Sequence, residues 1–240
     1  MRNVLLIARR ELAAYLRTMS GYVIIAVMLF IDGLLFNAFA VPGAAKKSSE
    51  VLADFFTMTS GITMVGAVFL SMRLIAEERQ TGTIALLYSS PVKDVEVVLG
   101  KFVASMGFLF VFFASTLYMP ALVAAYGKVS LGHVFAGYLG LSLVGAASLA
   151  IGTFGSSLTR SQVVAAVLSG VMCLALTTCW LLTKVTDRPL TEIVTQLAWW
   201  SHFDAFRTGL VHLKHVTYFG LVSFLALFAA TRVLEARRWR

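Results

Sequence analysis

The 240-residue chain is too apolar for a soluble globular domain. Hydrophobic residues make up 59% of it and charged residues 13%, with a mean hydropathy of +0.84, whereas soluble domains average roughly 45–50% and 25%. The net charge of +8 does not indicate a nucleic-acid-binding protein, because the Lys and Arg residues stand at the ends of apolar segments rather than along one soluble face. We therefore expect a membrane protein.

Six apolar segments are each close to the length of about 20 helical residues that crosses a bilayer. The first follows an amphipathic stretch and lacks the features of a cleaved signal peptide, so we expect it to remain in the mature chain. The predicted fold class is all-α, a polytopic membrane protein with six transmembrane helices. The segments cover residues 21–41, 55–75, 102–126, 133–154, 163–183 and 216–231.

The distribution of basic residues predicts the orientation of these segments. Thirteen of the 20 Lys and Arg residues fall at the two termini, in the loop between segments two and three, and at Arg160. The positive-inside rule then places both termini in the cytoplasm. Residues 1–20 alternate leucines with charged residues, which predicts a cytoplasmic amphipathic helix. Either it lies on the membrane surface or it serves only as a topology anchor.

The predicted external loop, residues 184–215, is the longest connection on the other side. Apolar residues recur at helical spacing in it and Trp199 precedes Trp200, so we expect one or two re-entrant helices at the membrane interface. His202, His212 and His215 also lie there. Because no cysteine or carboxylate pair joins them, we expect ordinary interfacial histidines and no metal site.

Polar and small residues within the spans suggest where helices meet. Asp32 lies in the middle of span one, where a carboxylate costs about 2.5–3.5 kcal/mol on insertion scales. One alternative is that Asp32 faces a translocation path or a dimer seam. The other is that it makes a structural hydrogen bond with Asn37 or with a span-five threonine. Small residues four apart predict close helix packing, within one chain or between two copies. They are Ala146, Ser148, Ala150 and Gly152, and then Ala165, Ser169, Cys173 and Thr177. Of these, Ser169 and Thr177 join Asp32 and Asn37 as candidates for the path or seam.

The stretch EERQTGTIALLYSSPV, residues 77–92, is unusually polar for this chain. It belongs to a predicted cytoplasmic loop, residues 76–100, that is much longer than the roughly 2–8 residues a helix connection needs. Gly82 between two threonines predicts a helix break, and Ser90-Pro91 predicts the start of a returning helix. The short apolar helix between them either docks on a cytoplasmic partner or rests on the bilayer.

Three runs in the chain resemble the permeases of ABC-2-type transporters, particularly their gliding-motility and nitrous-oxide-maturation branch. The runs are RLIAEERQTGTIALLYSSPVKDVEVVLGKF at 73–102, SLTRSQVVAAVLS at 157–169, and SHFDAFRTGL with RVLEARRWR from 201 onward. The resemblance extends over essentially the whole chain and implies a single transmembrane domain, residues 1–240. It also implies a coupling helix that docks on an ATPase subunit. That role falls on Glu77, Glu78, Arg79, Thr81, Gly82, Thr83, Leu86, Leu87 and Pro91, while Ala85 replaces a glutamate common in relatives.

The chain contains no G-x-x-x-x-G-K-[ST] phosphate loop, so we expect neither ATP binding nor enzymatic activity of its own. The resemblance implies ATP and Mg on a separate ATPase subunit, a second permease copy or related permease, and an accessory protein with a periplasmic domain. It implies a bacterial inner-membrane exporter of an envelope-related substrate, in contact with membrane lipids and not with nucleic acid. The alternatives are an ATP-linked scaffold or force-transmitting subunit and, with less support, an ion-coupled carrier.

Overall fold

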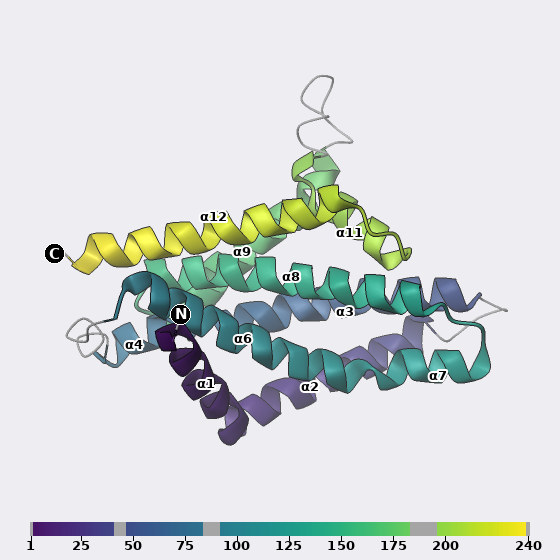
Figure 1. The fold of residues 1–240 in the computed structure, drawn as a ribbon, viewed down its shortest axis with the longest axis horizontal. Coiled ribbons are helices and arrows are strands. Elements are labelled where there is room, and N and C mark those ends of the chain that lie inside the picture. The colour runs from purple at the N-terminus through teal and green to yellow at the C-terminus, as the bar shows by residue number, and fades with distance from the viewer. Residues whose placement is uncertain (1, 41–46, 84–91, 183–195, 239–240) are drawn as a thin grey trace.

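The computed structural model describes residues 2–40, 47–83, 92–182 and 196–238, and all of its regular elements are helices (Figure 1). Long helices lie side by side along the molecule, and both termini lie at the end that carries α4. The elements are α1 (Arg2–Arg17), α2 (Met19–Leu35), a π-helical turn η1 (Phe36–Ala40), α3 (Ser48–Ser71), α4 (Ala76–Gln80), α6 (Asp94–Thr116), α7 (Tyr118–Tyr126), α8 (Leu131–Leu158), α9 (Gln162–Leu182), α11 (Trp199–Arg207) and α12 (Leu213–Arg238).

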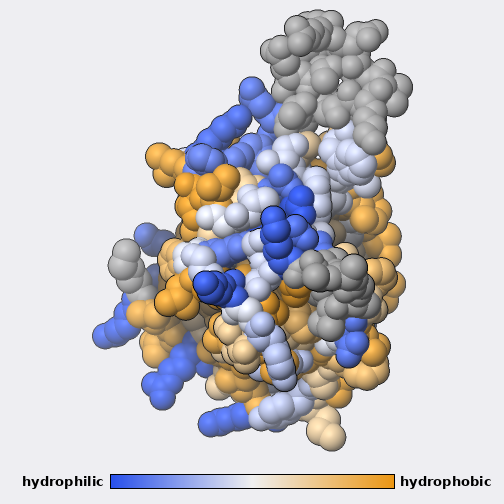
Figure 2. All heavy atoms as spheres, turned by 90° about the vertical axis from the view of Figure 1, so that its right-hand side faces the viewer, coloured by the Kyte–Doolittle hydropathy of each residue, from blue (hydrophilic) through white to orange (hydrophobic). Residues whose placement is uncertain are grey.

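Six of the described helical stretches are long and apolar enough to cross a membrane, which confirms the predicted number of spans. They show the exposure expected in lipid, where apolar side chains need not be covered by protein. Viewed along the helices from the end opposite α4, hydrophilic residues gather near the centre with hydrophobic ones on both sides, and further hydrophilic side chains project at the lower left (Figure 2). The spans are 19–39, 48–80, 94–126, 131–158, 162–181 and 213–237.

Helix α8 occupies the centre of the bundle and packs against α3, α6, α9, α11 and α12. Its glycines allow this, because a methyl group at Gly137 would overlap the ring of Phe56 and one at Gly140 would press on Phe206. Both phenylalanines are fully buried. Aromatic rings from α3 and α11 therefore fill the space that the missing α8 side chains leave open.

The small residues predicted to pack do so within the chain. Ala165, Ser169 and Cys173 are buried on the face of α9 that meets α8. A methyl group on Gly155 of α8 would collide with the hydroxyl of Ser169, which itself donates a hydrogen bond to the carbonyl of Gly152 at 3.4 Å. The partner of this face is therefore α8 of the same chain.

Helix α1 packs along α6 near the end that carries α4. A methyl group on Gly100 would press on Ile7, and one on Gly107 would contact Leu12, so two glycines of α6 bring the helices close. Leu5 and Leu6 on the other face of α1 stay exposed, at 67% and 59%. The predicted N-terminal amphipathic helix is present, with one apolar face on the protein and leucines directed away from it.

Candidate coupling junction

Helix α3 ends at Ser71 and α4 begins at Ala76 because a side chain from α8 enters the hydrogen-bond ladder between them. The hydroxyl of Ser156 accepts the backbone N–H groups of Ile75 (3.1 Å) and Ala76 (2.9 Å). It also donates to the carbonyl of Met72 at 3.1 Å. One buried serine thus satisfies backbone groups that the break would leave unpaired. The bend is fixed by packing against α8, with no glycine or proline in it.

Lys101 connects three elements beneath this bend. Its side chain is only 4% exposed, and its Nζ lies 2.8 Å from Oε1 of Glu78 on α4 and 3.3 Å from Oε1 of Glu11 on α1. Burial raises the pKa of Glu11, but Lys101 and the adjacent Arg10 outweigh it, so this pKa lies below its ordinary value of 4.5. The lysine thereby carries the ion pairs that hold α1 and α4 against α6.

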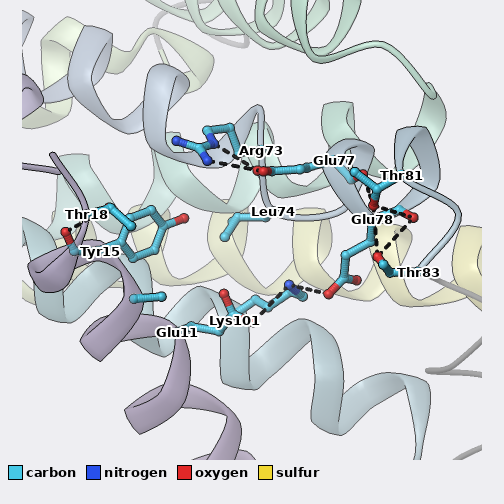
Figure 3. Close-up of a pocket in the computed structure, with 11 residues that line it drawn as sticks. Glu11, Tyr15, Thr18, Arg73, Leu74, Glu77, Glu78, Thr81, Thr83 and Lys101 are labelled. Carbon is cyan, nitrogen blue, oxygen red and sulfur yellow. Dashed lines mark hydrogen bonds and ion pairs between the residues drawn. The ribbon is translucent and has the colours of Figure 1, made fainter. Parts of the chain in front are cut away.

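A polar cavity of about 270 Å³ opens beside these ion pairs (Figure 3). On its opposite wall Arg73 and Glu77 form an ion pair of 2.8 Å, and Arg73 also donates to the hydroxyl of Ser20 at 3.3 Å. Tyr15 lines the same cavity, and burial raises its pKa to about 12, so its hydroxyl stays neutral. The cavity is bounded by α1, the α3–α4 bend and α6.

Gly82 ends α4 as the sequence predicts. Its φ of +75° is a left-handed conformation that glycine adopts without a side-chain clash, and it follows the last turn of α4 directly. The hydroxyls of Thr81 and Thr83 lie 2.9 Å apart on either side of it. Residues from Gln80 to Thr83 are exposed, so the chain reaches the surface at the end of α4.

The predicted coupling residues fall into two groups. Glu77, Glu78 and Arg79 contact their own chain, since Glu77 pairs with Arg73, Glu78 pairs with Lys101, and Arg79 donates to the carbonyl of Ser157. Thr81, Gly82 and Thr83 are exposed. Leu86, Leu87 and Pro91 lie outside the described residues, as does the predicted coupling helix itself. The first group holds the base of the loop in place.

The sequence profile of ABC-2 family transporter proteins matches residues 36–206, which is most of the chain and includes α4 and the bend. The chain belongs to the ABC-2 transporter family. No match was found among curated proteins. Family membership and the six apolar helices together make this a multi-pass membrane protein of the kind that forms the membrane domain of an ABC transporter.

The other predicted site residues of this ABC-2 protein are spread along the bundle. Asp32 is buried, and its Oδ1 accepts a hydrogen bond of 2.9 Å from the hydroxyl of Thr59 on α3. Asp32 therefore makes a structural hydrogen bond, as one of the two alternatives expected, but its partner is Thr59 of α3 and not Asn37 or a span-five threonine. Asn37 of η1 lines a separate cavity of about 580 Å³ bounded by the end of α2, the start of α3 and α7, whereas Ser169 is buried against Gly152 and Gly155 of α8. The four residues do not form one site.

The sequence pointed to Glu77 and Glu78 but not to the other residues that build the junction. The sequence patterns give Lys101 only as one of the basic residues of the loop between segments two and three, and they give Ser156 no role. A lysine inside a helix that enters the membrane is costly to bury unless a partner compensates its charge. This cost is the signal from which the Lys101 network could have been predicted. The bond from Ser156 joins residues 80 apart in the chain and has no local sequence signal.

Proposed function

We propose that this chain is the permease subunit of an ATP-driven ABC-2 transporter, and that ATP is hydrolysed by a separate ATPase subunit. The observation that carries the proposal is the Glu11–Lys101–Glu78 network at the base of the loop that begins with Gly82. A force applied to that loop acts directly on α4, and the ion pairs connect α4 to α1 and α6. Membership of the ABC-2 family supports an ATPase as the source of the force.

In this proposal the loop after Gly82 docks on the ATPase and α4 acts as a lever. Because α4 is short and attached to α8 through Ser156, its displacement changes the contacts of α8 at the centre of the bundle. Two permease copies present two such loops to two ATPase subunits and move an envelope-related substrate outward. The resemblance to the gliding-motility and nitrous-oxide-maturation branch supports an accessory protein with a periplasmic domain.

Co-purification with the candidate ATPase tests this proposal. We expect the wild-type permease to retain the ATPase, and the loop variant Gly82→Pro with Leu86→Asp to lose it while still inserting in the membrane. Lys101→Gln should retain the ATPase but lower the ATP hydrolysis that the permease stimulates. Glu235→Gln is the control, since it removes a more exposed ion pair with Arg232 on α12.

The possible outcomes distinguish the docking of the loop on the ATPase from the transmission of its movement through α4. If the loop variant keeps the ATPase, the docking surface is elsewhere and the proposal that α4 acts as a lever is wrong. If wild type and variants bind no ATPase, the permease proposal fails. If the ATPase binds and turns over without movement of any substrate into vesicles, the chain is the force-transmitting subunit that the sequence left as the alternative.

A further inference from the structure

A groove of about 550 Å³ runs along α12 at the end of the molecule opposite α4. It begins with polar side chains, those of His202, Lys214 and Thr217, and continues with Gly220, Leu221 and Phe224. Lys214, Thr217, Leu221 and Phe224 are spaced three or four residues apart and so share one face of α12. At 1.5 Å per residue, the face extends about 15 Å into the span.

The order of polarity along the groove follows the order of layers in a bilayer. Helix α12 begins the sixth span at Leu213, so Lys214 and Thr217 stand near the membrane boundary and Phe224 lies deeper. His202 closes one side of the polar end, with its ring stacked on Tyr218 at a centroid distance of 3.9 Å. A ligand that fits must be polar at one end and apolar over the rest of its length.

Gly220 gives the groove its depth without serving the packing of the protein. A methyl group built on Gly220 would find no heavy atom within 4 Å, so no described neighbour requires a glycine there. The missing side chain instead exposes the backbone of α12 between the polar and apolar ends. An acyl chain can approach the helix closely at this point, as helices do at other glycines in membranes.

The charge at the polar end is positive. Lys214 is exposed, and the groove contains no Asp or Glu among its described lining residues. Asp204, the acidic residue of nearby α11, is already paired with Arg207. Lys214 therefore has no carboxylate partner in the described part of the chain, and its ammonium group is available to an anion at the depth of lipid headgroups.

We propose that this groove binds one membrane phospholipid with an anionic headgroup. Its phosphate contacts Lys214, and an acyl chain lies over Gly220 toward Phe224. The site is independent of the proposed ATP-driven transport, since it uses only the fold and the end of the molecule away from α4. It differs from the general lipid shell in preferring anionic lipids at one position.

Native mass spectrometry of the full chain, titrated with dioleoylphosphatidylglycerol or dioleoylphosphatidylcholine, tests the site. We expect the first bound phosphatidylglycerol to be held about fivefold more tightly than phosphatidylcholine, the preference that one lysine near an anionic headgroup supplies. Lys214→Gln should make the affinities for the two lipids equal. Gly220→Leu should weaken both equally, because the new side chain fills the groove without a clash.

Two matched controls separate a site from general lipid contact. Gly170→Leu adds the same bulk on α9, where a methyl group also meets nothing within 4 Å, and Lys128→Gln removes an exposed lysine before α8. Both should leave the first lipid unchanged. Equal weakening by Gly170→Leu, or an unchanged lipid preference in Lys214→Gln, overturns the proposal. Lys214→Gln changes only an exposed side chain, so this outcome can be read even if Gly220→Leu fails to fold.

Discussion

The Nζ atom of Lys101 on α6 lies 2.8 Å from Oε1 of Glu78 on α4, and this ion pair joins the third span to the base of the loop before it. The two residues are 23 positions apart in the sequence and belong to separate helices. Because Lys101 also pairs with Glu11 on α1, one ammonium group serves two carboxylates. Displacement of α4 relative to α6 must therefore stretch or break an ion pair to the same ammonium group that anchors the N-terminal helix.

Replacement of Lys101 by methionine should destabilise the protein by about 3 kcal/mol, because it leaves the partly buried Glu78 without its cation and Glu11 with only the exposed Arg10. Thermal unfolding in detergent measures the loss. The triple variant Lys101→Met, Glu78→Gln and Glu11→Gln removes the stranded charges and should recover most of it. If the triple variant is no more stable than the single one, the network is not what holds α1 and α4 to α6.

Removal of the Ser156 hydroxyl should loosen the bend between α3 and α4. Ser156→Ala leaves the N–H groups of Ile75 and Ala76 buried without an acceptor, at a cost of about 1–3 kcal/mol. Hydrogen exchange over residues 72–80 should accelerate. Ser142→Ala is the control, since that hydroxyl donates to the carbonyl of Tyr138 in its own helix. Equal exchange in the two variants would contradict the role given to Ser156.

The sequence predicted the features that depend on composition and local chain chemistry. Six spans follow from apolar length alone, and the end of α4 just before Gly82 follows from the conformational freedom of glycine. The partners of Asp32 and Lys101 could not be read in this way, because each is supplied by a helix distant in the chain. A charged residue in an apolar segment indicates that a partner is needed, but the packing of the helices determines which residue that partner is.

Gly152 should tolerate no side chain, because α3 and α8 meet there. A methyl group at this position would overlap the hydroxyl of Ser71, next to the bend. Gly152→Ala should therefore destabilise the protein by about 1–3 kcal/mol through overpacking. Gly61→Ala on α3 is the matched control, since a methyl group there meets nothing within 4 Å, and it should be neutral or slightly stabilising. Thermal unfolding of both variants checks the difference, and similar transitions would refute the close contact.

The hydrogen-bonded pair of His202, which lines the groove, and His215 should make the free energy of unfolding depend on pH. His202 Nε2 lies 2.9 Å from the carbonyl of Gln196, which only accepts, so this nitrogen carries hydrogen. The neutral ring then has a bare Nδ1, which must accept the hydrogen of His215 Nδ1 at 2.9 Å. A further proton on His202 would turn its Nδ1 into a donor, so the contact would persist only if His215 moved its hydrogen from Nδ1 to Nε2. Lys214 and His212 add positive charge nearby.

Burial lowers the pKa of His202 below its ordinary value of 6.5, although the carbonyl of Gln196 opposes the shift. Between the folded and unfolded pKa values the unfolded chain binds more protons, so stability is full above about pH 6.5 and falls as the pH drops toward the folded pKa. The slope from this residue is at most about 1.4 kcal/mol per pH unit. His202→Gln should flatten the fall in unfolding temperature between pH 7 and pH 5.5, whereas His212→Gln, on an exposed ring, should not. Parallel pH profiles for wild type and His202→Gln would show that the pair is not the sensitive group.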